Sequence, residues 1–321
     1  MKLIDQIFSI NSEEEFEKRA LEVFHYQIKN CVVYRDYVQY LDWPSPTKSS
    51  EIPFLPIDFF KTHEIISIEK KAEITFKSSG TGGTRSKHYV AEKKLYERSF
   101  RYHFEKIIGD FKDTVVLALL PNYIEQGDSS LVYMVNDFIQ QSNDDLSGFI
   151  LNDFKELHTK YSKAIEKGKN VILFGVSYAL IDLAESKYFF PKATVIETGG
   201  MKGQRKEITK AELHQILRKG LNTSTIYSEY GMTELLSQAY STSNEIFKSS
   251  PLMKVLIRET NDPFSYVQEG KTGGINVIDL CNLYSCSFIA TQDLGKKTEN
   301  GFKIMGRFDH SDVRGCNLLV Q

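Results

Sequence analysis

The spacing of apolar residues predicts a helix near the N-terminus, followed by a proline-rich connection. Ser12 with Glu15 three residues later forms a capping-box pattern, which is typical of the first turn of a helix. The apolar face of this predicted helix consists of Phe16, Ala20, Leu21, Phe24 and Ile28. Residues 43–62 hold four of the eight prolines, so we expect this segment to be extended and irregular.

From residue 73 onward, short apolar runs alternate with helical patterns. The first strands are predicted at 73–77, 114–120, 170–174, 193–197 and 224–227. The helices between them are predicted at 91–108, 129–139, 178–184 and 209–217, with Gly220 as the C-cap of the last one. Four further strands follow with little helix, at 252–258, 274–280, 286–291 and 302–306.

This order of elements predicts an α/β protein. Repeated strand–helix units imply a parallel sheet covered by helices, and the strand-rich end implies a smaller β sheet or barrel-like layer. We expect a helical and irregular region over 1–72, packed on an α/β core over 73–250. A β-rich subdomain over 251–321 is expected to follow.

Composition excludes several classes of protein. With 41% hydrophobic and 26% charged residues the chain is typical of a globular protein, and a net charge of -2 argues against a nucleic-acid partner. No apolar run approaches the about 18 residues of a membrane span, and the N-terminus is a poor signal peptide, so we expect a cytoplasmic protein. The four cysteines form no CxxC pair and are expected to be reduced thiols without a zinc site.

The segment 78–87, SSGTGGTRSK, is the first that carries chemistry. Glycines let backbone N–H groups turn toward an anion, hydroxyls add donors, and Lys87 adds positive charge. The segment matches neither the Walker loop nor the GxGxxG fingerprint, and a flexible Ser/Gly linker is the alternative interpretation. Its predicted position between a strand and a long helix favours phosphate binding. The candidate phosphate-binding residues before Lys87 are Ser78, Ser79, Gly80, Thr81, Gly82, Gly83 and Thr84.

Four ordered motifs resemble those of adenylate-forming enzymes, the superfamily of acyl-CoA synthetases and peptide-synthetase adenylation domains. After SSGTGGTRSK come YSEYGMTE at 227–234, TQDLG at 291–295 and GRFD at 306–309. Within that superfamily, the segments at 121–135, 197–203 and 312–316 also resemble the acyl-protein synthetases of bacterial bioluminescence operons. Those LuxE-like enzymes activate a fatty acid with ATP, hold it as a thioester and pass it to a reductase.

The resemblance implies a role for each motif residue. The Gly-rich segment with Lys87 would hold the β- and γ-phosphates of ATP, Thr233 would bond the α-phosphate, and Glu234 would hold Mg²⁺. Asp293 would accept both ribose hydroxyls, since a carboxylate suits two adjacent donors. The remaining nucleotide-binding residues would be Gly199, Gly200, Met201, Tyr230, Gly231 and Arg307. The alternatives are a helix-start glutamate at Glu234 and a turn-capping aspartate at Asp293.

The end of the sequence departs from the superfamily pattern. Most adenylate-forming enzymes continue past the hinge into a mobile domain that carries a lysine, whereas the sequence given ends at Gln321, twelve residues after Asp309. The luminescence-type synthetases carry their acyl-accepting cysteine near the C-terminus, which points to Cys316 as the thiol acceptor. The alternative is that Cys316 packs under the last strand.

Three functions therefore compete. The favoured one is an ATP-dependent acyl-protein synthetase that hands a fatty or other carboxylic acid to a reductase or carrier protein. The second is an adenylate-forming ligase that supplies CoA or a carrier thiol through a separate partner. The third is a non-catalytic nucleotide-binding subunit. The sequence leaves open the acyl chain length, the final acceptor and whether the chain forms a homo-oligomer.

Overall fold

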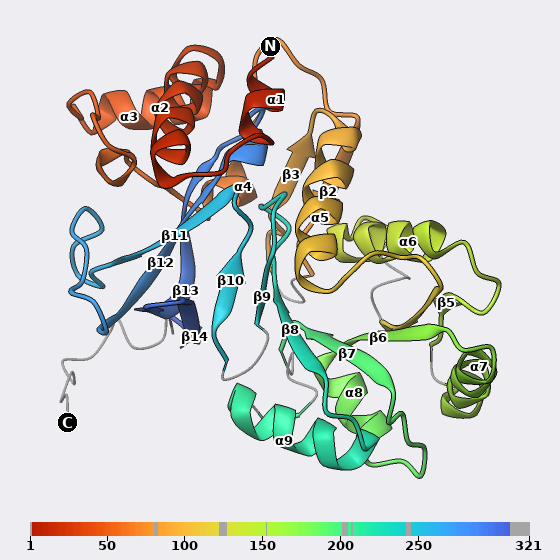
Figure 1. Cartoon of the computed structure of the whole chain (residues 1–321). Coiled ribbons are helices and arrows are strands. Elements are labelled where there is room, and N and C mark those ends of the chain that lie inside the picture. Colours follow the sequence, from red (N-terminus) through yellow and green to blue (C-terminus); the bar gives the residue numbers. More distant parts are fainter. Residues whose placement is uncertain are drawn as a thin grey trace.

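A large twisted sheet runs through the middle of the molecule, as the computed structural model shows (Figure 1). The structure describes residues 2–79, 83–121, 127–151, 153–200, 205–206, 208–241 and 245–308. No helix within these ranges is both long and apolar enough to cross a membrane.

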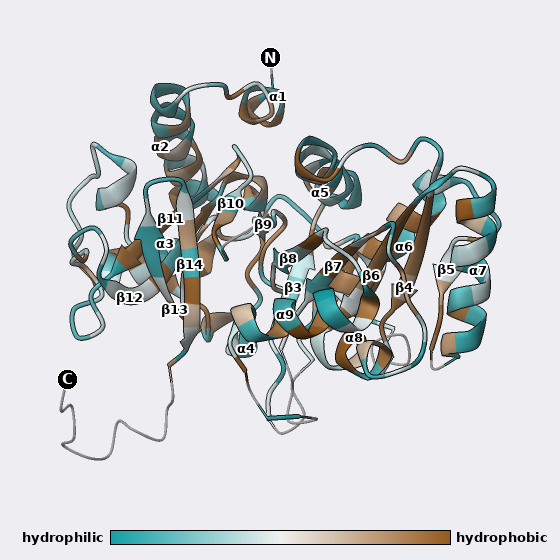
Figure 2. Ribbon diagram, turned by 60° about the horizontal axis from the view of Figure 1, so that its bottom comes forward, coloured by the Kyte–Doolittle hydropathy of each residue, from teal (hydrophilic) through white to brown (hydrophobic). Residues whose placement is uncertain are grey.

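One half of this sheet is parallel. Its strands are β5 (Gly148–Phe149), β4 (Thr114–Leu119), β6 (Asn170–Val176), β7 (Ala193–Thr198) and β8 (Ile226–Tyr230), in that spatial order. The helices that connect them are α6 (Ser130–Ser142), α7 (Phe154–Glu166), α8 (Ser177–Ala184) and α9 (Lys210–Leu221). Strands covered by helices are buried on both faces, and β4 is apolar except at its first residue and buried along its whole length. Figure 2 shows the apolar residues concentrated in these strands. The predicted parallel, helix-covered sheet is confirmed.

The other half is antiparallel and continues the same sheet. Beyond β8 the order is β9 (Ala239–Ser241), β10 (Phe247–Ser249), β14 (Gly301–Arg307), β13 (Phe288–Thr298), β12 (Thr272–Asp279) and β11 (Met253–Arg258). The junction between β10 and β14 is a single residue pair, Phe247 with Phe302. The β-rich C-terminal part expected from the sequence is therefore present, but it is joined edge to edge with the parallel part rather than stacked as a separate layer.

The N-terminal elements pack against the antiparallel half (Figure 1). They are α1 (Leu3–Ile7), α2 (Glu13–Asn30), α3 (Val32–Tyr40), η1 (Ser49–Glu51), β1 (Leu55–Pro56) and α4 (Phe59–Thr62). Among them, β1 joins the large sheet itself by pairing in parallel with β13. Ser12 Oγ caps α2 by accepting the Glu15 N–H at 3.2 Å, as predicted. The buried Gln27 amide donates to the carbonyls of Asn282 and Leu283 at 2.9 and 3.1 Å, which fixes α2 to the turn after β12.

Strand β3 (Lys87–Val90) escaped prediction, as did several other short elements such as α3, β5, β9 and β10. It pairs antiparallel with β2 (Ile74–Lys77) in a separate two-stranded sheet. Helix α5 (Lys93–Ile107) begins only after β3. The Gly-rich segment is therefore the loop of a hairpin, and its predicted place between a strand and a helix is wrong.

The predicted role of Gly220 is also wrong. Helix α9 continues to Leu221, and Asn222 takes the left-handed C-cap conformation with φ +55°. Gly220 lies inside the helix, where a β-carbon would overlap the Ala184 carbonyl oxygen and come within 2.6 Å of the Ala184 Cβ. The glycine therefore permits the close approach of α8 and α9.

Replacing this glycine tests the helix contact. Gly220→Ala should lower the free energy of unfolding by about 1–3 kcal/mol, because α9 must move away from α8 to admit the methyl group. Gly148→Ala is the matched control, since the nearest atom to its added β-carbon is Lys160 Nζ at 3.8 Å. Denaturant melts compare the three proteins. Equal stability of the two variants would show that the α8–α9 approach tolerates a side chain.

Candidate active site

The base of the Gly-rich loop is closed by reciprocal hydrogen bonds. Beyond the pair formed by Lys77 and Lys87, the Ser78 N–H donates to the Ser86 carbonyl at 3.0 Å and the Ser86 N–H donates to Ser78 Oγ at 3.0 Å. Ser78 thus shapes the loop through its own side chain. Gly83 and Thr84 are exposed, and Gly80, Thr81 and Gly82 lie outside the described residues.

Asp128 fixes this hairpin to the segment that leads into α6. Its carboxylate accepts from Arg85 Nη2 at 2.9 Å and lies 3.0 Å from Lys77 Nζ, and its carbonyl accepts the Lys77 N–H at 2.9 Å. Burial alone would raise the pKa of Asp128, but hydrogen bonds and charge from Lys77 and Arg85 outweigh it and lower the pKa below its ordinary value. Two of the hairpin's cations are therefore engaged, whereas the Lys87 side chain is exposed.

The segment after β8 meets the hairpin at Glu234. The Glu234 carbonyl accepts from Asn282 Nδ2 at 2.7 Å. Burial raises the pKa of the Glu234 carboxyl group, and the nearby Ser86 hydroxyl and the Arg307 charge oppose the shift only in part. Among the described residues, no basic side chain lies within 4.0 Å of this carboxyl group. The structure therefore brings together the two motifs that the sequence places about 150 residues apart.

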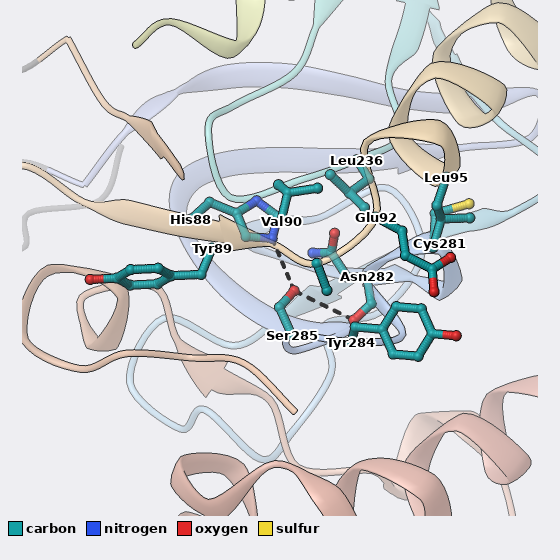
Figure 3. Close-up of a pocket in the computed structure, with 11 residues that line it drawn as sticks. His88, Tyr89, Val90, Glu92, Leu95, Leu236, Cys281, Asn282, Tyr284 and Ser285 are labelled. Atoms are coloured by element: carbon teal, nitrogen blue, oxygen red, sulfur yellow. Dashed lines mark hydrogen bonds between the residues drawn. The ribbon is translucent and has the colours of Figure 1, made fainter. Parts of the chain in front are cut away.

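His88 links the same two segments and was given no role by the sequence. Its Nδ1 lies 2.8 Å from the Thr233 carbonyl oxygen, and its Nε2 lies 2.9 Å from Ser285 Oγ (Figure 3). The ring is 1% exposed, and burial lowers its pKa to about 4, so His88 is neutral at physiological pH. The cavity beside it, which Figure 3 shows, has a volume of only about 10 Å³ and extends to Cys281 and Tyr284.

Tyr230, Asp293 and Arg307 form a second cluster next to Glu234. The Tyr230 hydroxyl donates to Asp293 Oδ2 at 2.8 Å, and Arg307 Nε lies 3.2 Å from Asp293 Oδ1. Burial raises the pKa of Asp293, while the Arg307 charge and the Tyr230 hydrogen bond oppose it. The Tyr230 ring packs edge-on against Phe302, with centroids 5.7 Å apart. The three predicted residues are thus in contact, on strands β8, β13 and β14.

The turn after β7 rests on a buried polar network. Glu197 is fully buried and accepts from Lys210 Nζ at 2.5 Å and from Ser177 Oγ at 2.7 Å. Burial would raise the pKa of Glu197, but Lys210, His214 and Ser228 lower it to about 2. Ser177 Oγ is also 3.2 Å from the carbonyl of Gly199, whose φ of +72° suits a glycine. The network positions the predicted Gly199-Gly200 turn, while Met201 lies outside the described residues.

A second buried carboxyl group, that of Glu229, lies on the adjacent strand, and its pKa is shifted in the opposite direction. Glu229 pairs with Thr198 across β7 and β8, and its carboxyl accepts the Thr198 hydroxyl. Burial and the neighbouring Glu197 charge raise the pKa of Glu229 to about 7, although the Thr198 hydrogen bond opposes the shift. Gly231 follows closely, and a β-carbon there would overlap Glu229 Oε1. A side chain at position 231 would therefore displace the Glu229 carboxyl group.

Comparison with known proteins decides the family. The family model for acyl-protein synthetase, LuxE, matches residues 7–321, which is nearly the whole chain. The chain belongs to the LuxE acyl-protein synthetase family. The resemblance drawn from the motifs is confirmed. A comparison with curated proteins gives no match.

Solved structures share the fold of this LuxE-family chain. ATP-bound MatB from Rhodopseudomonas palustris is 18% identical with a TM-score of 0.54, and the match covers 73% of this chain and 47% of MatB. An open conformation of 2-hydroxyisobutyryl-CoA ligase, in complex with 2-HIB-AMP and CoA, is 11% identical with a TM-score of 0.65, over 92% and 71% of the two chains. The LuxE-family chain thus spans about half of MatB, and at these identities the likeness shows the fold alone.

The Glu229 carboxyl group of this LuxE-family chain gives a pH-dependent prediction. Because its folded pKa is raised above the unfolded value, its stabilising contribution is full below pH 4.5 and is lost as the pH rises through about 7. Glutamine does not ionise, so Glu229→Gln should not lose this contribution. Between pH 5 and pH 8, the unfolding free energy of Glu229→Gln minus that of wild type should therefore rise by about 2 kcal/mol, since one pKa unit is worth about 1.4 kcal/mol.

Glu197, whose pKa is shifted in the opposite direction, provides the control. Glu197 has a lowered pKa, so its contribution is present above pH 4.5, and Glu197→Gln should destabilise the protein at both pH values. Urea melts at pH 5 and pH 8 measure all three proteins. A difference between Glu229→Gln and wild type that stays flat with pH would contradict the raised pKa.

Proposed function

We propose that this protein activates a carboxylic acid, namely a fatty acid, with ATP to form an acyl-adenylate, and then transfers the acyl group to a protein thiol. The observation that carries the proposal is the contact between the hairpin and the YGMTE segment, where His88 Nδ1 lies 2.8 Å from the Thr233 carbonyl oxygen and the Ser86 hydroxyl lies near the buried Glu234 carboxyl group. It joins the Gly-rich hairpin and the YGMTE segment in one site, as a shared nucleotide requires. The family match supports the reaction class.

The proposed first step brings two anions together. A carboxylate oxygen of the acid attacks the α-phosphorus of ATP, the new O–P bond forms, the α–β phosphoanhydride bond breaks, and pyrophosphate leaves with the electron pair. Since both reactants are negative, the site must neutralise charge and hold them in line. Backbone N–H groups of a Gly-rich hairpin and the exposed Lys87 ammonium group are suited to the departing pyrophosphate.

The other motif residues would bind the rest of the nucleotide. In this proposal Thr233 contacts the α-phosphate, and Tyr230 and the Gly199–Gly200 turn lie on either side of adenine. Asp293 would receive the ribose hydroxyls. Its carboxylate already binds Tyr230 and Arg307, so ribose would have to share the carboxylate with them or displace one of them. Arg307 is the one that can leave, because its side chain is 72% exposed.

The Glu234 carboxyl group fits a magnesium ion. It is a hard oxygen donor, buried without a direct ion pair among the described residues, and a carboxylate facing phosphate is favourable only with a cation between them. When bound, Mg²⁺ would supply positive charge to the phosphate oxygens. The described residues contain no cluster of three or more His, Cys, Asp and Glu, so the other ligands would come from phosphate and water.

Transfer to a thiol completes the proposed reaction. A thiolate attacks the carbonyl carbon of the mixed anhydride, the C–S bond forms, and the bond to the AMP oxygen breaks. Cys316 is the proposed acceptor and lies outside the described residues, whereas Cys31, Cys281 and Cys286 are buried. Burial raises the pKa of Cys31 to about 11, which disfavours the reactive thiolate there.

Exchange of labelled pyrophosphate into ATP tests the first step. Wild type should catalyse exchange only with a suitable acid and Mg²⁺, and EDTA should stop it. Glu234→Gln should lower the rate by about 100-fold or more, because the amide keeps the shape but not the charge. Glu156→Gln, at an exposed side chain of α7, is the control and should leave the rate unchanged. Absence of exchange by wild type with a broad panel of acids would instead favour a non-catalytic nucleotide-binding subunit.

Labelled fatty acid tests the second step. With ATP, wild type should retain label that hydroxylamine removes, and Cys316→Ser should retain none. Cys31→Ser is the control for a buried thiol and should label like wild type. Equal labelling of wild type and Cys316→Ser would eliminate Cys316 as the acceptor. Label that passes to added CoA with Cys316→Ser would support a ligase that uses a separate thiol.

A further inference from the structure

His88 occupies an unusual place between the two motifs of the proposed site. It lies in β3, directly after Lys87, and its side chain points into the protein toward Ser285 (Figure 3). Phe60 of α4 meets its ring edge-on, with centroids 5.6 Å apart and planes at 85°. With both ring nitrogens engaged and the ring buried, His88 has no access to substrate and does not act as an acid or base in the chemistry.

The partners of the ring fix its tautomer. A backbone carbonyl can only accept, so the bond to the Thr233 oxygen at 2.8 Å requires a proton on Nδ1. The neutral ring then has a lone pair on Nε2, which accepts the Ser285 hydroxyl at 2.9 Å. The Ser285 hydroxyl also lies 3.5 Å from the Asn282 carbonyl, a much longer approach that leaves its proton for His88. The ring therefore donates toward the YGMTE segment and accepts from the turn after β12.

The hairpin thus contacts the YGMTE segment at two successive residues, Thr233 and Glu234. Ser86 and His88 are two positions apart in extended chain, so their side chains point to the same side. Ser86 contacts the Glu234 carboxyl, and His88 contacts the Thr233 carbonyl. Two contacts of this kind determine orientation as well as distance, which one contact cannot do.

We propose that His88 is a positioning residue, which through its Nδ1–H bond to the Thr233 carbonyl sets the Thr233-Glu234 segment at the correct distance from the phosphate-binding hairpin. The inference rests on the proposed function, since it concerns how the two halves of that nucleotide site are aligned. Loss of the bond should misplace the polyphosphate relative to Thr233 and Glu234, while the carboxylic acid would still bind. The deficit should therefore appear in kcat/KM for ATP and leave the KM for the acid unchanged.

Two substitutions separate the two ring nitrogens. The amide of asparagine reaches the position of Nδ1, and the amide of glutamine reaches the position of Nε2. His88→Asn should keep the donor to Thr233 and retain kcat/KM for ATP within about 5-fold of wild type, whereas His88→Gln should lose it and fall by about 50-fold, as a 1 Å misplacement at a site can cost. Ser285→Ala, which leaves the Thr233 bond in place, should resemble His88→Asn.

A second buried histidine provides the matched control. His103 in α5 bonds the Lys248 carbonyl at 3.1 Å, and burial lowers its pKa to about 4 as well, but neither residue belongs to a motif. His103→Asn and His103→Gln should lower the melting temperature about as much as the His88 variants, without changing kcat/KM for ATP. This comparison separates loss of alignment from loss of stability.

The outcomes are distinct from those of the proposed function. Equal kcat/KM for His88→Asn and His88→Gln, or effects no larger than those of the His103 pair, would overturn the positioning role even if wild type is fully active. If wild type activates no acid, the proposed function fails. The positioning role is then tested by the Kd for MgATP, measured by calorimetry, which should weaken more in His88→Gln than in His88→Asn and should not change in the His103 variants. The ¹⁵N shifts of wild type give a further check, since a proton on Nε2 instead of Nδ1 would contradict the assigned hydrogen bonds.

Discussion

Glu197 and His88 are buried polar side chains, and the partners that offset the cost of their burial organise the candidate site. An unpaired polar group costs several kcal/mol in a nonpolar surrounding, and a charge costs more. Glu197 therefore takes Lys210 and two hydroxyls, and His88 takes the Thr233 carbonyl and the Ser285 hydroxyl. These bonds come from segments far apart in sequence, so satisfying them also brings the motifs together.

The pKa values of two neighbouring carboxyl groups in this edge are shifted in opposite directions. Glu197 is paired with an ammonium group, which lowers its pKa, while burial and the Glu197 charge raise the pKa of Glu229 one strand away. Two charges so close in a nonpolar surrounding would repel, and neutralising one of them relieves the repulsion. The strand that leads into Tyr230 can therefore be buried without a second cation. Glu234 differs, because its carboxyl group forms no ion pair among the described residues, and the Arg307 charge and the Ser86 hydroxyl only partly offset the effect of burial.

Much of the sheet could be predicted from the sequence because strands buried on both faces are continuous apolar runs, as in β4 and β6. Strand β3 could not, since KHYV is short, alternates only weakly and follows a loop rich in serine and glycine. The motifs identified Glu234 and Asp293 as candidate site residues. The role of His88 could not be predicted, because no sequence pattern distinguishes it from any other buried histidine and its partner carbonyl lies 145 residues further along the chain.

The hairpin of β2 and β3 forms its own two-stranded sheet, and no β-ladder joins it to the large sheet within the described chain. The two halves of the large sheet are continuous with each other through β9 and β10, so they cannot separate without breaking backbone pairing. The hairpin therefore keeps its place beside the sheet edge through the ion pairs of Asp128, the His88 hydrogen bonds and the burial of Phe76 and Val90 in the core, and not through a shared β-ladder. Substitutions at these positions would shift the hairpin relative to the sheet edge without breaking backbone pairing within the large sheet.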